Sequence, residues 1–353
     1  METRNGYGVG GQPTSSMMPD RLSQCAVDNT KSLIAWIKRI LLNLCLKVRL
    51  LSKKEIKGIM PPMITVFKSN EDLDEEGTRA FVNFLIEKGV HGIIPNGSTG
   101  EFASLTDEER QRVIQVVVDE ANDRVPVYAG VSHNSTRLTI EQGRFAKDVG
   151  ADGVMIVPPY YCLPTEKEVY AHFKAVSEAV DLPVMLYNNP WFSKVDVSHW
   201  TIARMFEEGI VSSVKEAHGD PARVHNIIML TKGKMTVFYG HDVNAFEGLA
   251  VGAHGWVSGL GNLIPDKSRQ LYDLMTEGKD LEKGRSLWYE ILALIHLSTA
   301  SRTGERTNWL QQIKEGLAMR GHPVGAARRP LLPPEPSERR QLVAVLKTLK
   351  LAK

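Results

Sequence analysis

The chain has 353 residues, of which 42% are hydrophobic and 24% are charged, and its formal net charge is +2. These values are typical of a globular protein with one large domain or two smaller ones. Basic residues are spread along the chain instead of forming a dense patch, which argues against a nucleic-acid partner. The three scattered cysteines exclude a disulfide framework and a cysteine-based zinc site: Cys25, Cys45 and Cys162. We therefore expect a cytoplasmic protein without a metal or cofactor.

The first 55 residues differ in composition from the rest of the chain. Residues 1–30 are rich in Gly, Ser, Pro and Asn and have no hydrophobic period, which predicts disorder. The apolar stretch 32–51 predicts an amphipathic helix that packs on the main body or on another subunit. A membrane-surface or targeting helix is the alternative, as is a later translation start at Met17, Met18 or Met60. Four cations inside the stretch argue against a membrane span: Lys38, Arg39, Lys47 and Arg49.

From residue 56 onward, short apolar runs alternate with helical patterns. The helical patterns include two with a capping box at the start, Thr106 with Glu109 and Thr165 with Glu168. The expected strands are Ile59–Phe67, Gly92–Pro95, Val125–Val131, Gly153–Val157, Pro183–Tyr187, Ile210–Lys215, Thr236–Gly240 and Trp256–Ser258. The helices expected between them include Asp74–Lys88, Thr106–Asn122, Thr136–Val149 and Thr165–Ala179.

Eight strand–helix units in residues 56–278 predict a (β/α)8 TIM barrel. A doubly wound sheet is disfavoured because no Gly-x-Gly-x-x-Gly turn follows the first strand. Glycine pairs at the helix-to-strand returns make His91 and His254 turn residues. Beyond the barrel the pattern predicts a helical layer over 279–353, with helices at Leu281–Ser298, Thr307–Ala318 and Ser337–Leu349.

Lys215 closes one of the expected interior strands. Catalytic side chains of such barrels lie at the carboxyl ends of the strands. Burial of a lysine is costly and favours the neutral amine, which can attack a ketone and form an imine. A lysine that snorkels to solvent or forms an ion pair is the alternative interpretation.

Four motifs occur in order along the barrel: GSTGE at 97–101, PPYY at 158–161, YNNP at 187–190 and VKE at 214–216. Together they resemble the dihydrodipicolinate synthase and N-acetylneuraminate lyase family of class I, imine-forming lyases, over about residues 56–334. The resemblance implies a homo-oligomer, a dimer or tetramer, that takes a small 2-keto acid and needs no cofactor.

The resemblance also implies roles for individual residues. Lys215 would form the Schiff base with pyruvate or a related 2-keto acid, and Tyr187 would move protons to and from that centre. Ser98 would link Tyr187 to solvent. Thr99 would bind the keto-acid carboxylate, together with backbone N–H groups of the turn from Gly97 to Gly100.

Further candidates come from the remaining strand ends. Tyr161 would reach into the neighbouring subunit's site, and the backbone carbonyl of Val257 would accept a hydrogen bond near the keto acid. Thr65, Gly240 and Asp242 are candidate substrate-binding residues, because Thr65 and Gly240 end strands and Asp242 can accept bonds from substrate hydroxyls. Two more residues at the mouth, Tyr160 and Asn188, are expected either to bind or to brace the loops.

The second substrate is less well defined by the sequence. Dihydrodipicolinate synthases carry an arginine two residues past the proline of their tyrosine motif, where this chain has Phe192, and Lys194 replaces it only in part. Ala217 and the run 240–243 match the sialic acid lyases only partly. Aldol cleavage or condensation and dehydration therefore stay open. The alternatives are 4-hydroxy-tetrahydrodipicolinate synthesis and deamination or dehydration of a hydroxylated cyclic imine or sugar acid.

Two titratable residues near the mouth bear on that choice. Glu216 and His241 are candidate proton-transfer groups for an elimination, although His241 is also interpreted as a loop residue that Asp242 satisfies. A ligand sensor without activity is disfavoured because Lys215 and Tyr187 are both present. A metal-dependent aldolase is disfavoured because no cluster of His and carboxylate ligands occurs at the strand ends.

Overall fold

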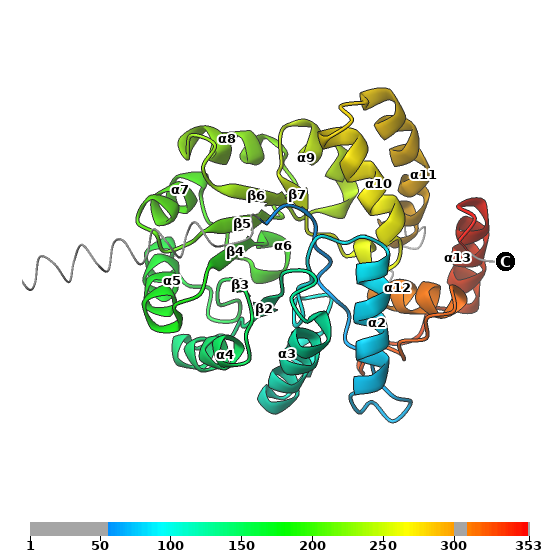
Figure 1. The fold of residues 1–353 in the computed structure, drawn as a ribbon, viewed down its shortest axis with the longest axis horizontal. Coiled ribbons are helices and arrows are strands. Elements are labelled where there is room, and N and C mark those ends of the chain that lie inside the picture. The colour runs from blue at the N-terminus through cyan, green and yellow to red at the C-terminus, as the bar shows by residue number, and fades with distance from the viewer. Residues whose placement is uncertain (1–55, 300–308, 352–353) are drawn as a thin grey trace, which may run out of the picture. The chain divides into compact units, whose positions relative to one another are not determined.

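The computed structural model describes residues 56–299 and 309–351, which fall within one compact unit. At the centre of this unit lies a curled sheet of seven parallel strands, and helices surround it (Figure 1). The predictions for residues 1–55, including the helix at 32–51, lie outside the described residues. Among the described helices, none is long and apolar enough to cross a membrane.

The strands of the sheet follow the order β1-β7-β6-β5-β4-β3-β2, and all neighbouring strands are parallel. β1 is shorter than the predicted strand Ile59–Phe67, because Pro61 and Pro62 have no N–H to donate to a ladder. The strands are β1 (Gly58–Ile59), β2 (Tyr128–Gly130), β3 (Gly153–Ile156), β4 (Val184–Asn188), β5 (Ser213–Glu216), β6 (Thr236–Tyr239) and β7 (Gly255–Trp256).

The predicted strand Gly92–Pro95 is not part of this seven-stranded ladder. It is represented instead by two isolated parallel bridges, Pro62 with Ile94 and Ile93 with Val127. Backbone hydrogen bonds accompany the bridges: the N–H of Met63 donates to Ile94 at 2.9 Å, and that of Ile93 donates to Pro126 at 3.0 Å. This segment therefore lies between β1 and β2, the two strands at the ends of the sheet order.

The helices confirm the predicted periodic segments to within two residues at each described end. Both predicted capping boxes are present, at Thr106 and Thr165. The α-helices around the sheet are α2 (Glu75–Glu87), α3 (Asp107–Ala121), α4 (Thr136–Asp148), α5 (Glu166–Val180), α6 (Pro190–Ser193), α7 (His199–Glu207), α8 (Ala222–Leu230), α9 (Ala245–Ala250) and α10 (Pro265–Thr276). Three short 3₁₀ helices, labelled η, are also described: η1 (Phe102–Ser104), η2 (Asp242–Asn244) and η3 (Leu260–Asn262).

Three further helices form the C-terminal layer. They are α11 (Leu281–Thr299), α12 (Trp309–Met319) and α13 (Pro336–Thr348). They gather on one side of the unit, where α11 lies beside α10 and α13 lies beside both α11 and α12 (Figure 1). The layer packs against the helices on one side of the sheet, and some of its residues line the cavity at the carboxyl ends of the strands.

The sheet separates two apolar clusters. The outer cluster, between strands and helices, includes Leu186 of β4 and Val214 of β5. The inner cluster includes Met185 and Tyr187 of β4. Successive side chains on a strand alternate between the two faces, so Tyr187 and its register partner Lys215 face inward. Other members of the inner cluster come from around the sheet: Met60, Ile94, Tyr128, Met155, Phe238 and Val257.

Candidate active site

A cavity of about 560 Å³ opens at the carboxyl ends of the strands. Its inner part is lined by residues from strand ends and the turns that follow them: Ser98, Thr99, Tyr187, Asn189, Lys215, Ala217, Gly240, His241, Asp242 and Val257. Its outer part is largely apolar and comes from α6 and from the C-terminal layer, including Trp191, Phe192, Leu294, Trp309, Ile313 and Leu342. Seven of the ten predicted site residues therefore line one cavity.

Lys215 and Tyr187 lie side by side in the inner part of the cavity. They are register partners on β5 and β4, and they are only 3% and 5% exposed. The Lys215 Nζ lies 3.8 Å from the centre of the Tyr187 ring, in a cation–π arrangement. The amine therefore faces the cavity next to a phenol and not the bulk solvent.

Gly240 provides the space for the lysine side chain. A Cβ at this position would lie 2.7 Å from Cγ and 2.9 Å from Cε of Lys215. Contacts this short would force the side chain to move. Gly240 therefore sits in the predicted site, where the absence of a side chain shapes the path of Lys215.

The Tyr187 hydroxyl accepts a hydrogen bond of 2.7 Å from Nδ2 of Asn189. Asn189 is buried and lines the cavity. No role was predicted for Asn189, although it stands inside the YNNP motif. Its position two residues after the tyrosine was the available signal, but the turn into α6 that directs its side chain back to the phenol is visible only in the structure.

The turn that carries Ser98 and Thr99 is fixed from below. The Thr65 hydroxyl donates to the Gly100 carbonyl at 2.6 Å, so Thr65 braces the turn and does not line the cavity, contrary to the prediction. Within the turn, the N–H of Gly100 donates to Gly97. Gly97 itself does not line the cavity either. The part of the turn that does so consists of Ser98 and Thr99.

A buried ion pair joins this turn to the C-terminal layer. Lys314 of α12 lies 2.6 Å from the carboxylate of Glu101, and both side chains are almost fully buried. Glu101 also accepts a bond of 2.8 Å from the N–H of Arg328. Burial lowers the pKa of the Lys314 ammonium, and the Glu101 carboxylate opposes that change. The helical layer thereby holds the loop that presents Ser98 and Thr99.

Asp242 faces the cavity but is already bonded by the protein. Its carboxylate accepts from the Trp256 indole at 2.9 Å and from the N–H of Leu260 at 3.3 Å. Burial raises the pKa of this carboxyl, while a hydrogen bond from Ser258, the charge of Lys215 and the two bonds above lower it.

The neighbouring His241 is paired differently from the prediction. Its Nδ1 lies 3.2 Å from Oδ1 of Asn244, so Asn244 and not Asp242 satisfies the ring. His241 nevertheless lines the cavity, and its ring centre lies 6.2 Å from that of Trp191. His241 thus lies at the border between the inner and outer parts of the cavity.

Several other predicted mouth residues lie outside the cavity. Tyr161 is 87% exposed, and Tyr160 packs edge-on against Phe102. Glu216 is fully buried on the outer face, since it follows Lys215 on the same strand and points the other way. Asn188 is buried beside Glu216 and braces the strand ends. The prediction that Glu216 could transfer protons at the mouth is therefore wrong.

Neither turn histidine reaches the site, as the sequence predicted. Nδ1 of His91 accepts from the N–H of Ile59 at 3.0 Å, and Nδ1 of His254 accepts from the N–H of Val237 at 3.2 Å. Within the described residues, no group of three or more His, Cys, Asp or Glu side chains could hold a metal ion.

An inward-facing lysine beside a phenol, at the mouth of a curled parallel sheet, is the arrangement of a class I, Schiff-base-forming lyase. A family model described as the dihydrodipicolinate synthetase family matches residues 55–349. The chain belongs to this family, whose members form a Schiff base with pyruvate.

Curated relatives include two 4-hydroxy-tetrahydrodipicolinate synthases. That of Pelobacter propionicus is 37% identical over 83% of this chain and 98% of its own length. That of Methanocaldococcus jannaschii is 38% identical, with the same two coverages.

Solved structures support the same relationship. A dihydrodipicolinate synthase from Acinetobacter baumannii in complex with pyruvate has a TM-score of 0.78 at 33% identity and covers 84% of this chain and 100% of its own. A prophage protein of the same family from E. coli K12, also in complex with pyruvate, has a TM-score of 0.78 at 30% identity, covering 85% and 100%.

Proposed function

We propose that Lys215 is the Schiff-base residue of this enzyme and that its substrate is pyruvate or a closely related 2-keto acid. The observation that carries the proposal is the buried Nζ, 3.8 Å from the centre of the Tyr187 ring, inside a cavity that also contains Ser98 and Thr99. The neutral amine would add to the keto carbon, and loss of one water molecule, with uptake of one proton from the Tyr187 phenol, would leave a protonated imine.

The protonated imine serves as an electron sink for the next step. A proton leaves the neighbouring carbon, or a carbon–carbon bond to it breaks, and the electron pair moves into an enamine. Tyr187 is the group placed to carry the proton, because a phenol both donates and accepts. Asn189 holds its hydroxyl in place. Thr99 would bind the keto-acid carboxylate through its hydroxyl, Ser98 would link Tyr187 to solvent, and Val257 would offer its carbonyl.

We propose further that the second substrate, or the leaving aldehyde, carries an uncharged group at the outer end of the cavity. Phe192 stands where the family resemblance places an arginine, and it is 63% exposed at the cavity wall. Among the described residues that line the cavity, Lys215 is the one Lys or Arg side chain. A ring cannot replace a bidentate guanidinium as a partner for a carboxylate.

A second candidate is 4-hydroxy-tetrahydrodipicolinate synthase, which condenses pyruvate with aspartate semialdehyde. The names of the curated relatives at 37% and 38% identity favour it. The two candidates share the pyruvate step and differ only in the acceptor, so one enzyme preparation can separate them.

The experiment has two stages. Borohydride reduction in the presence of pyruvate, followed by peptide mass spectrometry, is expected to find the adduct on Lys215, and an unmodified Lys215 would refute the Schiff-base proposal. The enzyme is then supplied with pyruvate and either aspartate semialdehyde or uncharged and hydroxylated aldehydes. A higher kcat/KM with aspartate semialdehyde selects the second candidate.

The strand order also bears on the fold. We propose that residues 92–95 form the second strand of a closed (β/α)8 barrel, which the bridges at Ile93 and Ile94 and the inner apolar cluster support. We also propose a dimer or tetramer in which the exposed Tyr161 contributes to the neighbouring subunit's site. Sedimentation of the purified protein tests the assembly. The cytoplasmic location stays a prediction that cell fractionation would test.

A further inference from the structure

The residues that follow Tyr187 and Lys215 on their strands are polar and fully buried. Asn188 and Glu216 are register partners at the ends of β4 and β5, and both are 0% exposed. Because side chains alternate along a strand, they lie on the outer face, directly behind the reacting pair. A buried amide and carboxylate at these positions are costly unless they are bonded.

Asn188 ties the two strand ends together. Its Nδ2 lies 3.0 and 3.2 Å from the two carboxylate oxygens of Glu216 and 3.0 Å from Oδ1 of Asp196. Its Oδ1 accepts the N–H of Val197 at 3.0 Å. The N–H of His218 donates to Glu216 at 2.9 Å. One side chain thereby connects β4, β5 and the segment that follows α6.

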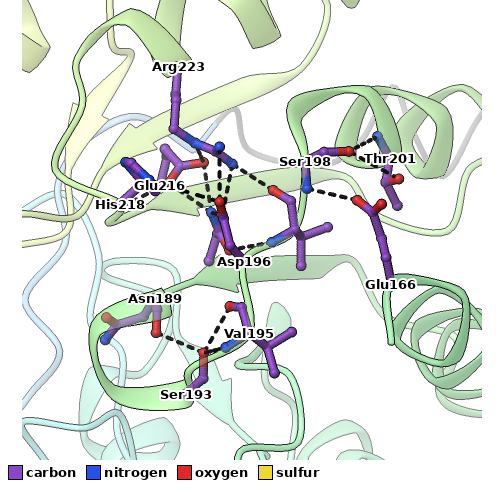
Figure 2. Close-up of polar contacts among 12 residues, drawn as sticks. Glu166, Asn189, Ser193, Val195, Asp196, Ser198, Thr201, Glu216, His218 and Arg223 are labelled. Atoms are coloured by element: carbon purple, nitrogen blue, oxygen red, sulfur yellow. Dashed lines mark hydrogen bonds and ion pairs between the residues drawn. The ribbon is translucent and has the colours of Figure 1, made fainter. Parts of the chain in front are cut away.

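Arg223 of α8 closes the network from the helical side. Its Nε lies 3.1 Å from Glu216 Oε2, and its Nη2 lies 3.2 Å from Asp196 Oδ1. The same nitrogen donates to the Val197 carbonyl at 2.6 Å. Figure 2 shows the guanidinium reaching both carboxylates. A planar fork can bridge these groups at once, whereas a single ammonium cannot.

We propose that Asn188, Glu216 and Arg223 are positioning residues that fix the distance between Lys215 and Tyr187. The inference rests on the proposed function, since it concerns the same imine-forming pair. Packing alone does not require these residues, because apolar side chains of similar volume stabilise a buried site at least as well as an ion pair does. Positioning gives them a role, because a displacement of about 1 Å at a reacting centre can cost about 100-fold in rate.

The test follows exchange of the pyruvate methyl protons in D₂O by NMR, a reaction that needs only the imine and the proton carrier and no second substrate. Asn188→Ala is expected to lower the exchange rate at saturating pyruvate about 100-fold and to change KM for pyruvate less than about twofold. KM is preserved because Thr99, which would hold the carboxylate, lies on a separate turn.

A double-mutant cycle separates positioning from general loss of structure. If Asn188 acts by placing the phenol, Asn188→Ala costs little once Tyr187→Phe has removed the hydroxyl. Arg223→Lys keeps the charge but loses the planar guanidinium, and its effect on exchange is likewise expected to be small once Tyr187→Phe is present. If Asn188→Ala does not fold, Arg223→Lys takes its place in the cycle.

Ser198→Ala is the matched control. Ser198 lies in the same outer layer (Figure 2), where it caps α7 by accepting from the N–H of Thr201 at 3.2 Å, and it does not bond to either strand end. It is expected to lower the melting temperature and leave exchange unchanged. Multiplicative losses in the double variant, or an equal loss of exchange in Ser198→Ala, would overturn the inference. Absence of a borohydride adduct on Lys215 in the unaltered enzyme would instead overturn the proposed function.

Discussion

The two parts of the cavity are built in different ways. The inner part consists of polar groups on strand ends, such as Lys215, Tyr187 and Thr99, and each of these side chains is nearly fully buried. The outer part consists of apolar side chains from α6 and the helical layer, and two of them, Trp191 and Phe192, are more than half exposed. The proposed reaction is thus tied to the strand ends, whereas the choice of second substrate is left to the apolar side chains that α6 and the helical layer present to the outer part.

The largest expected effect removes the chemistry of the inner part. Lys215→Ala is expected to abolish pyruvate exchange and turnover, a fall of about 10⁶-fold or more, because no imine can form. Stopped assays with enzyme in excess measure the residual rate, and the melting temperature is the control for folding. A variant that keeps even a hundredth of the rate would show that another group forms the imine.

Gly240→Ala perturbs the same part sterically and keeps every reacting group. The added Cβ would displace the Lys215 side chain, and we expect kcat to fall about 100-fold. Gly209→Ala is the contrasting variant, since Gly209 has φ +74° with no atom within 4 Å of an added Cβ, so it should lose stability and keep activity. Equal activities of the two variants would show that the lysine tolerates the crowding.

Phe192→Arg tests the outer part. A guanidinium at this position would give a carboxylate-bearing aldehyde a charged partner, and such bonds are worth about 1.5–3 kcal/mol. We expect kcat/KM for aspartate semialdehyde to rise about 10- to 100-fold, with pyruvate exchange unchanged. If exchange changed as well, the two parts of the cavity would not be independent.

The smallest effect on activity is expected from His172, which lies in neither part of the cavity. Its protonation in acid is expected to change the stability of the fold and not the chemistry of the site. Burial lowers the pKa of His172 from 6.5 to about 4. As the pH falls, the His172 imidazole therefore binds a proton in the unfolded chain before it does so in the folded one. Its contribution to the free energy of unfolding is full above pH 6.5 and is lost as the pH falls toward 4. Wild type is expected to lose about 3 kcal/mol more than His172→Gln between pH 7 and pH 4, measured by urea unfolding. Identical pH profiles would contradict this.

Local patterns predicted much of this molecule. Both capping boxes and the described helices agreed with their periodic segments, because a helix start depends on residues three positions apart. The strand at 92–95 was predicted from its apolar run, yet it forms only two isolated bridges outside the seven-stranded ladder. Strand pairing depends on partners that are distant in sequence, and local propensity does not contain that information.

The direction in which side chains point explains which site residues were predicted wrongly. Motif order placed Lys215, Tyr187, Ser98 and Thr99 at one mouth, and the cavity contains all four. Thr65 and Glu216 were misassigned because the sequence shows that a residue is near a strand end but not which face of the wall it occupies. Asn189 was overlooked for the same reason.

By itself, the sequence determined the family, the alternating architecture and which amine and phenol are proposed to react, because motif spacing and hydrophobic period are properties of the linear chain. The tertiary structure alone decided that Gly240 opens the path of the lysine, that α12 braces the Ser98–Thr99 turn through Glu101 and Lys314, and that Asn188, Glu216 and Arg223 lie behind Lys215 and Tyr187. These relations join residues up to 213 positions apart, and only the folded chain brings such residues within contact distance.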